Sequence, residues 1–264
     1  MMIDFEIFID RFLSRERKPK EIGRYYPSEA GLCMRQVWYS YKFPKETEKD
    51  LLRIFHAGNL VHDFVVDVFR SERNPDVVLV ESEFPFKIEQ DGFTVSGRVD
   101  DLVLLKEEDK KVLVEVKSCR SINGMEEPEN THKMQLQLYM HATGIRNGVV
   151  LYVEKNTLKS RSFAVAYDQD WARRIMDRFG LLDRHLKDDV MPAAEGKTVP
   201  HLSYMCSRCD YAEECGRDGM EDGGELKTPR PKKDAGETGG RPPVPVKSGP
   251  SKPKNGRLSD FVRS

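Results

Sequence analysis

The chain has 264 residues, of which 38% are hydrophobic and 33% charged, and its formal net charge is −1. This composition predicts one large or two small globular domains. It argues against a protein whose whole surface binds nucleic acid, while leaving room for a local basic groove. The sequence contains no run of about 18 apolar residues, so we expect no membrane span. Apolar and acidic residues precede basic ones at the N-terminus, the reverse of a secretory signal, which predicts a cytoplasmic protein.

Helical and strand patterns alternate along the first 218 residues. Apolar residues at helical spacing predict helices, and short runs rich in Val, Leu and Phe predict strands. The expected elements are a short helix over 3–16, a largely buried helix over 51–70, strands between 77 and 119, a helix over 130–143, a strand pair over 147–167 and a helix over 168–189. This order predicts one α/β domain over residues 1–218.

Composition changes after Gly216. The segment 219–254 is rich in Pro, Gly, Lys and Glu and has almost nothing to bury, which predicts a disordered linker. The last ten residues, 255–264, regain apolar side chains at Leu258, Phe261 and Val262. A short apolar peptide on a flexible tether is typical of a segment that binds a pocket on a partner.

Two carboxylates and a lysine fall on one predicted hairpin. Folding its strands about the charged run between them sets Asp100 opposite Glu115, within one register step. Glu115 and Lys117 are two residues apart, so they share one face of their strand. Gly97 can introduce a bulge, so strict alternation is not assumed for Asp100.

The residues alone leave two interpretations of this hairpin open. In the first, Glu115 and Lys117 form an ion pair on an exposed face. In the second, Asp100 and Glu115 hold a hard cation such as Mg²⁺ or Mn²⁺, which lowers the pKa of a bound water. Lys117 would then orient that water or stabilise the negative charge that develops on a phosphate.

Two helical pairs accompany the hairpin. His62 lies four residues after Gly58 on the same helix face, and the missing side chain of Gly58 would let that face approach another element closely. Gln135 and Tyr139 are also four residues apart and face one way. Taken alone, His62 is more often a structural or solvated histidine than a ligand. Gln135 and Tyr139, taken alone, form a pair at the edge of the core.

The cysteines predict a metal site. Cys206, Cys209 and Cys215 have the spacing C-x2-C-x5-C, one thiolate short of a tetrahedral site. Cys33 and Cys119 are the candidates for the fourth ligand. Cys119 ends the strand of Lys117 and is interpreted as a structural thiol, whereas Cys33 would close the domain across a long loop. Zinc and an iron–sulfur cluster both accept four thiolates, and the spacing leaves that choice open.

The motifs G-x-x-x-H, G-x-x-D, E-x-K and Q-x-x-x-Y follow one another in this order. Together they resemble the RecB-like branch of the PD-(D/E)XK nucleases. That resemblance implies a restriction-endonuclease-like α/β core with a mixed central sheet flanked by helices. It assigns catalysis to Asp100, Glu115 and Lys117, binding of Mg²⁺ or Mn²⁺ to His62, Asp100, Glu115 and the Val116 carbonyl, and DNA binding or site support to Gln135 and Tyr139.

The distant cysteine with C-x2-C-x5-C is similar to the pattern of iron–sulfur nucleases. The segment S-E-A-G-L-C-M-R-Q-V-W-Y resembles the N-terminal cysteine segment of the Cas-four type of CRISPR-associated exonuclease, with Met34 where that family usually has Pro. The short chain without a helicase fits this type best. The resemblance covers roughly residues 20–218 and implies a [4Fe–4S] cluster held by Cys33, Cys206, Cys209 and Cys215.

The family implies a metal-dependent DNA nuclease, most often a single-stranded DNA exonuclease of 5′ to 3′ polarity. It implies a role in CRISPR spacer acquisition or DNA repair, with a CRISPR integrase as one partner. Arg35 and Arg208, near the cysteines, are expected to contact the DNA backbone. The alternative from another class is a non-catalytic DNA-end-binding or sliding-clamp adaptor with a structural metal cluster.

The C-terminal peptide bears on that alternative. Leu258, Phe261 and Val262 resemble the sliding-clamp-binding pattern Q-x-x-L-x-x-F-F, with Asn255 in the Gln position and Val262 in the second aromatic position. Short motifs arise readily by chance. A clamp-binding peptide and a terminal remnant without function therefore both stay open.

Overall fold

Strand β3 organises a mixed six-stranded sheet in the computed structural model, which describes residues 3–14 and 18–218. One edge of β3 pairs with β2 along nearly its whole length, and the other edge pairs first with β1 and then with β4. β4 is parallel to β5, and β5 is antiparallel to β6. The strands are β1 (Arg24–Tyr25), β2 (Val77–Gln90), β3 (Phe93–Leu105), β4 (Lys110–Cys119), β5 (Asn147–Glu154) and β6 (Ser160–Ala166).

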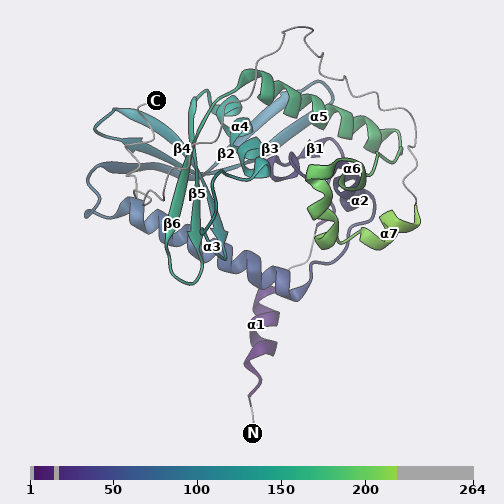
Figure 1. Ribbon diagram of the computed structural model, residues 1–264, viewed down its shortest axis with the longest axis horizontal. Coiled ribbons are helices and arrows are strands. Elements are labelled where there is room, and N and C mark those ends of the chain that lie inside the picture. The colour runs from purple at the N-terminus through teal and green to yellow at the C-terminus, as the bar shows by residue number, and fades with distance from the viewer. Residues whose placement is uncertain (1–2, 15–17, 219–264) are drawn as a thin grey trace, which may run out of the picture.

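Helices cover both faces of this sheet, and a separate group of short helices lies beside it (Figure 1). α3 runs along one face, and α1, which contacts one end of α3, projects away from the body of the molecule. The helices are α1 (Phe5–Leu13), η1 (Pro27–Glu29), α2 (Met34–Lys42), α3 (Lys49–Arg70), α4 (Asn130–Thr143), α5 (Gln169–Lys187), α6 (Glu195–Thr198), η2 (Pro200–Arg208) and α7 (Ala212–Arg217).

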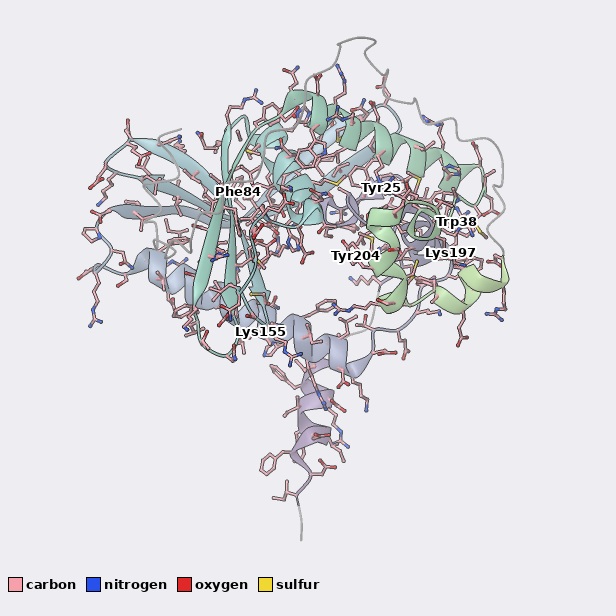
Figure 2. All side chains as sticks on the ribbon, in the orientation of Figure 1. Tyr25, Trp38, Phe84, Lys155, Lys197 and Tyr204 are labelled. Carbon is pink, nitrogen blue, oxygen red and sulfur yellow. The ribbon has the colours of Figure 1, made fainter. Side chains whose placement is uncertain are left out.

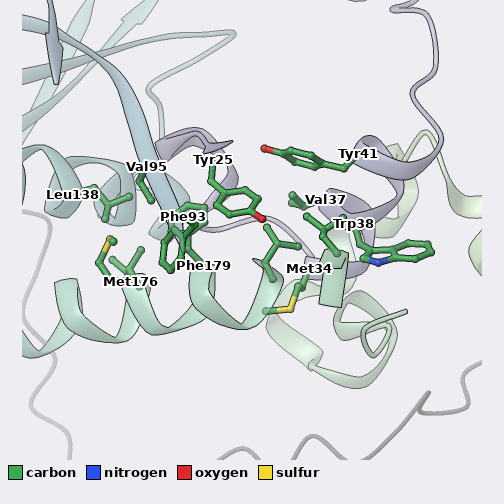
Figure 3. Packing of buried hydrophobic residues seen from close by; sticks show 14 of the residues in the cluster. Tyr25, Met34, Val37, Trp38, Tyr41, Phe93, Val95, Leu138, Met176 and Phe179 are labelled. Carbon is green, nitrogen blue, oxygen red and sulfur yellow. The ribbon is translucent and has the colours of Figure 1, made fainter. Parts of the chain in front are cut away.

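The core has three connected parts. Val61 and Val65 of α3 pack on the valines of one sheet face, and Leu136 of α4 packs on the opposite face. α2 and α5 cover the part of the sheet formed by β1 and the start of β3 (Figure 3). There the rings of Tyr25 and Phe179 stack with centroids 5.9 Å apart. This arrangement confirms the predicted α/β architecture with a mixed sheet flanked by helices.

The helix predicted to be largely buried over 51–70 is buried along one narrow stripe only. Val61, Val65 and Val66 are its buried residues, whereas Ile54 and Phe55 are more than half exposed. Sequence periodicity locates the apolar side of a helix, but it does not show how wide a strip of that side the neighbouring sheet covers.

The chain irregularity predicted at Gly97 lies elsewhere. The register shift is in β2 between Leu79 and Glu81, so the prediction of a bulge at Gly97 is wrong. Gly97 is instead required by close packing, because a Cβ atom there would lie 3.0 Å from Cδ of Pro27.

The predicted linker over 219–254 and the peptide over 255–264, with Leu258, Phe261 and Val262, lie outside the described residues and stay predictions. Within the described part of the chain, no helix is long and apolar enough to cross a membrane.

Candidate active site and four-thiol pocket

The candidate active site forms where β3 changes partners. β3 pairs with β1 at Thr94 and Val95 and with β4 from Asp101 onward, so among the described strands none pairs with that edge between them. Asp100 lies at the end of this gap. Continuing the β3–β4 register sets Asp100 opposite Glu115, as the sequence predicts. The Val116 backbone N–H donates a hydrogen bond of 2.8 Å to Asp100 Oδ2.

Glu115 is fully buried in the central strand β4, and Lys117 is its counterion. Lys117 Nζ lies 2.5 Å from Glu115 Oε1, which confirms that the two side chains share one strand face. Neither Glu115 oxygen accepts a hydrogen bond of good geometry from the described residues. The interpretation of this ion pair as an exposed one is wrong, because the carboxylate is inside the protein.

His62 of α3 reaches the site through Asp101, a residue that sequence reasoning missed. His62 Nε2 lies 3.2 Å from Asp101 Oδ2, and the other oxygen of Asp101 is buried without a hydrogen bond from any described residue. Strict alternation would turn Asp101 away from Asp100, so only the consecutive carboxylates in G-x-x-D-D could have indicated it. α3 lies close to β4 at Gly58, where an added Cβ would be at an ordinary contact distance of 3.4 Å from Ser118 Oγ, so the close approach does not depend on the missing side chain.

α4 supplies the opposite wall of the site. Lys117 Nζ donates a 3.3 Å hydrogen bond to Gln135 Oε1, and Gln135 Nε2 donates to the Tyr139 hydroxyl. Tyr139 is only 2% exposed, so its position fits the predicted site support and does not fit contact with DNA.

His132 is a second residue that sequence reasoning missed. It precedes Gln135 by one helical turn, and its Nδ1 lies 2.7 Å from the Tyr152 hydroxyl. Burial, with a contribution from the Lys117 charge, lowers the pKa of His132 to about 3. His132 is therefore neutral at physiological pH, and its spacing of three from Gln135 was the one available signal.

The site holds three carboxyl groups, those of Asp100, Asp101 and Glu115, and two basic groups, those of His62 and Lys117. Burial, together with the neighbouring Glu115 carboxylate, raises the pKa of Asp100 to about 8. The hydrogen bond with Asp101 raises the pKa of His62 to about 9, although burial works against its charged form. Burial opposes the charge of Lys117 also, but Glu115 and Asp100 outweigh it and raise the pKa of Lys117 above its ordinary value.

The ligand atoms that this site offers, mainly carboxylate oxygens, are of the type that binds a hard divalent cation. As they stand, no three His, Cys, Asp or Glu side chains of the described residues are placed to hold one metal ion. The buried oxygens of Asp101 and Glu115 that lack hydrogen bonds are nevertheless oxygen ligands of the kind that Mg²⁺ and Mn²⁺ take. A cation would also relieve the repulsion that raises the pKa of Asp100.

A second cluster of functional side chains lies in the lobe of α2, α6, η2 and α7. Figure 2 labels Trp38 and Lys197 in this lobe, well away from Phe84 on the sheet. A small cavity of about 50 Å³ in the lobe has four cysteines among its lining residues, Cys33, Cys206, Cys209 and Cys215, and is called here the four-thiol pocket. Cys119 does not line this cavity. The structure therefore brings together the four cysteines that the sequence grouped.

Glu195 and Arg178 connect the chain segment of Cys33 to the segment that leads into the three C-terminal cysteines. Glu195 Oε2 accepts a 2.7 Å hydrogen bond from the Met34 N–H, directly after Cys33. Arg178 of α5 forms an ion pair with Glu195 at 2.5 Å and donates to the Leu32 carbonyl at 2.7 Å. Arg178 thereby attaches both chain segments, the one next to Cys33 and the one with Glu195, to the long helix α5.

Arg35 is buried in the same lobe, so the prediction that it contacts DNA is wrong. It is 1% exposed, and its Nε donates a 2.7 Å hydrogen bond to the Pro192 carbonyl. Its Nη1 lies 3.9 Å from Cys215 Sγ. Arg208, in contrast, is exposed.

Comparison with known proteins agrees with this geometry. Residues 19–216 match the family model of the PD-(D/E)XK nuclease superfamily. Over 198 residues the chain is 22% identical to the CRISPR-associated exonuclease Cas4 of Saccharolobus solfataricus, which covers 74% of this chain and 89% of that relative. The crystal structure of SSO0001 is similar in fold, with a TM-score of 0.53 and 21% identity, covering 80% of this chain and 92% of that one. The chain belongs to the PD-(D/E)XK nuclease superfamily.

Proposed function

We propose that the protein is a metal-dependent DNA nuclease, and specifically a single-stranded DNA exonuclease that works from the 5′ end. Nucleases of this superfamily generally use divalent metals. The observation that carries the proposal is the convergence of His62, Asp100, Glu115 and Lys117 where β3 and β4 separate. A buried carboxylate beside a lysine and a second carboxylate is costly for stability unless it serves chemistry or binding.

His62, Asp100 and Glu115 would hold the cation, and Asp101 would position His62. The carbonyl of Val116 is the remaining proposed ligand. Bound there, Mg²⁺ or Mn²⁺ would activate a water and neutralise charge on the scissile phosphate. Lys117 would stabilise the charge that develops on the phosphate oxygens. Gln135 would hold the Lys117 ammonium in place, and Tyr139 would orient Gln135.

The proposal extends to the four-thiol pocket, which would hold a [4Fe–4S] cluster. Its support is the chemistry of the donor set, four thiols around one cavity with the Arg35 cation beside them. By analogy with the Cas4 relative, the activity would serve CRISPR spacer acquisition or DNA repair, with an integrase as one partner. A sliding clamp would bind the peptide over 255–264, tethered by the linker over 219–254.

A cleavage assay tests the catalytic proposal. Full-length protein purified without oxygen is incubated with Mn²⁺ and single-stranded DNA labelled at either the 5′ or the 3′ end. We expect 5′ label to be released first, and we expect Glu115→Ala to lower the cleavage rate by about 10³-fold or more, as loss of a ligand and charge at the reacting centre does.

Glu72→Ala, which removes an exposed glutamate outside the site, is the matched control and should cleave like the wild type. If Glu115→Ala cleaves DNA as fast as the wild type, and circular dichroism shows that both proteins are folded, the proposal that this site is catalytic is contradicted. That result would favour the alternative of a non-catalytic DNA-end or clamp adaptor.

A further inference from the structure

Helix α1 carries an apolar face on its outside. Phe5, Phe8, Ile9 and Phe12 are between 48% and 75% exposed, and of the nine residues of α1 Leu13 alone is buried. The spacing of the four exposed residues places them on one face of the helix. These four residues are called here the α1 stripe. An apolar face of this kind is typical of a helix that packs against another surface.

α1 is attached to α3 by a different face. Asp10 forms ion pairs with Arg53 at 2.7 Å and with Lys49 at 3.0 Å, both residues of α3. Asp10 is two residues from Phe8 and from Phe12, and two residues correspond to about 200° around a helix of 3.6 residues per turn. The contacts with α3 therefore hold α1 in place while the α1 stripe faces outward.

α1 is too short to be a stable helix without partners. It has nine residues, and isolated helices shorter than about 12–15 residues are marginal in water. The ion pair of Asp10 with Lys49, whose side chain is 74% exposed, contributes little to stability. Figure 1 shows α1 projecting from the body of the molecule. A short helix in this position, with its apolar face outward, indicates that a further surface covers it.

The exposed apolar area matches one half of a dimer interface. The Phe12 ring lies 5.8 Å from the His56 ring of α3, and the exposed Leu60 follows His56 by one turn on the same side. With about 150–250 Å² for a large side chain, Leu60 and the α1 stripe present roughly 500 Å² of apolar surface. Apolar atoms form about 56–58% of an interface, so the whole contact would bury roughly 900 Å² per copy. Stable interfaces bury about 800 Å² per partner.

The charges along α1 favour a second copy of the same helix in antiparallel orientation. Asp4 caps the N-terminus and Glu6 lies in the first turn, whereas Arg11 lies in the last turn. An antiparallel copy sets the acidic end of one helix beside the basic end of the other, and it opposes the two helix dipoles. A parallel copy would bring like ends together.

A lipid surface fits α1 less well than a second copy does. Helices that lie on membranes carry mainly Lys and Arg on their polar face, whereas α1 carries Glu6 and Asp10 against the single Arg11. α1 also lies outside residues 19–216, the part of the chain that matches the nuclease superfamily.

We propose that two copies of this chain associate through the α1 stripe, with their α1 helices antiparallel. A two-fold axis between Phe8 and Ile9 sets Phe5 of one copy opposite Phe12 of the other, so the same surface serves both copies. The proposal does not depend on the nuclease function, because the α1 stripe contains no residue of either candidate site.

Sedimentation velocity of the full-length protein, from nanomolar to high micromolar concentration, tests the association. We expect a species of twice the 30.4 kDa mass of one chain. Phe8→Glu/Phe12→Glu should raise the dissociation constant of the dimer about 100-fold or more. It places charges in the centre of the contact, where a few aromatic residues carry most of the binding energy.

Three matched variants keep this test specific. Val80→Glu introduces the same charge at an exposed valine of β2 and should dimerise like the wild type. Phe8→Leu/Phe12→Leu keeps the stripe apolar and should retain most of the affinity. Glu115→Ala should also dimerise like the wild type, whether or not it cleaves DNA. Circular dichroism checks that each variant is folded.

Amide hydrogen exchange localises the contact without any substitution. In the wild type, the amides of residues 5–13 should exchange more slowly at concentrations where the dimer forms than at concentrations where it dissociates. Exchange in α5 should not depend on concentration.

Several results would overturn the proposal. One is a wild type that is monomeric at every concentration, and another is a dimer that Phe8→Glu/Phe12→Glu leaves intact. A third is protection of residues 5–13 that is independent of concentration and is lost when residues 219–264 are removed. That result would assign the α1 stripe to the C-terminal segment of the same chain.

Discussion

The carboxylate site and the four-thiol pocket are built in opposite ways. Asp100, Glu115 and Lys117 lie within 18 positions of one another on two paired strands, and their geometry follows from the register of one hairpin. The thiol pocket joins Cys33 to Cys206, Cys209 and Cys215 through contacts among short helices. The first region is positioned by the backbone of a sheet, and the second by side chains that hold distant segments together.

Electrostatics differ between the two regions as well. The carboxylate site has three carboxyl groups and two basic groups, and buried oxygens of Asp101 and Glu115 lack hydrogen bonds from the described residues. The thiol pocket has a buried cation, Arg35, near the sulfur atoms. One region therefore offers oxygen ligands to a cation, whereas the other already contains a cation of the protein itself. Each of the following predictions alters one region and uses the other as the reference.

After Glu115→Ala, Lys117→Met should have the largest effect. We expect the cleavage rate to fall about 10²–10³-fold, while the iron content of the thiol pocket stays as in the wild type. The variant should also lose about 1–3 kcal/mol of stability, because it leaves the Glu115 charge buried without its partner. Urea unfolding and a single-turnover cleavage assay measure the two effects.

The double variant Glu115→Gln/Lys117→Met should regain most of that stability without regaining activity, since both members of the ion pair become uncharged together. If the double variant is less stable than Lys117→Met, the ion pair is not what stabilises this part of the sheet.

Cys33→Ser should empty the thiol pocket. We expect bound iron to fall from about four atoms per chain to near zero, with loss of the brown colour. The domain should stay folded, because Glu195 and Arg178 still hold the segment. Cys119→Ser is the matched control and should keep its iron. A colourless, iron-free wild type prepared without oxygen would instead indicate zinc.

The carboxylate site should be sensitive to pH. Asp100, with a pKa of about 8, and His62, with a pKa of about 9, must both lose a proton to bind a cation. We therefore expect Mn²⁺ affinity to rise with pH, by up to about tenfold per unit for each proton displaced, and to level off above pH 9. Isothermal titration at several pH values measures this rise.

The stability of the metal-free protein should change with pH in the opposite direction to the Mn²⁺ affinity, falling as the pH rises. The pKa of Asp100 rises on folding from its ordinary value of 3.8, so its contribution is present below about pH 4 and is lost as the pH rises through 8. His62, also raised, contributes below about pH 6.5 and loses its contribution as the pH passes 9. A melting temperature of the metal-free protein that rises over this range would contradict the assignment of both shifts.

The smallest effects are expected from alanine substitutions at two glycines, Gly58 and Gly196, and they should differ between the two. A Cβ at Gly58 would meet only Ser118 Oγ at 3.4 Å, so Gly58→Ala should fit and gain helix stability of up to about 1 kcal/mol. A Cβ at Gly196 would lie 2.7 Å from Cys206 Sγ. Gly196→Ala should therefore displace that sulfur and lower iron content, while cleavage-site geometry is unchanged. Thermal melts and iron assays on the two variants check this contrast.

The hairpin was predictable from sequence because its register depends on local features. The charged turn and the two-residue spacing of Glu115 and Lys117 place both side chains correctly. Asp101 was missed because strict alternation turns neighbouring residues to opposite faces, and Asp100 was the residue that matched the motif. Arg35 was misplaced on the surface, since its burial depends on Pro192 and Cys215, which are more than 150 residues away in the chain.

Cys33 was correctly grouped with the distant cysteines, but the contacts of Glu195 and Arg178 that hold its segment in place could not be predicted from the sequence. Neither Arg178 nor Glu195 belongs to a motif, and only the packing of α5 on the short helices reveals their role. Local patterns therefore predicted which side chains come together in both regions, whereas the contacts that hold the thiol pocket required the fold.

The attachment of Cys33 through Met34 N–H, Glu195 and Arg178 has a consequence for maturation. Those bonds involve no sulfur, so both halves of the pocket are held near each other before any cofactor is delivered. If the proposed cluster binds there, its binding would resemble that of a ligand to a folded receptor rather than folding around a nucleus, and it would cost less entropy.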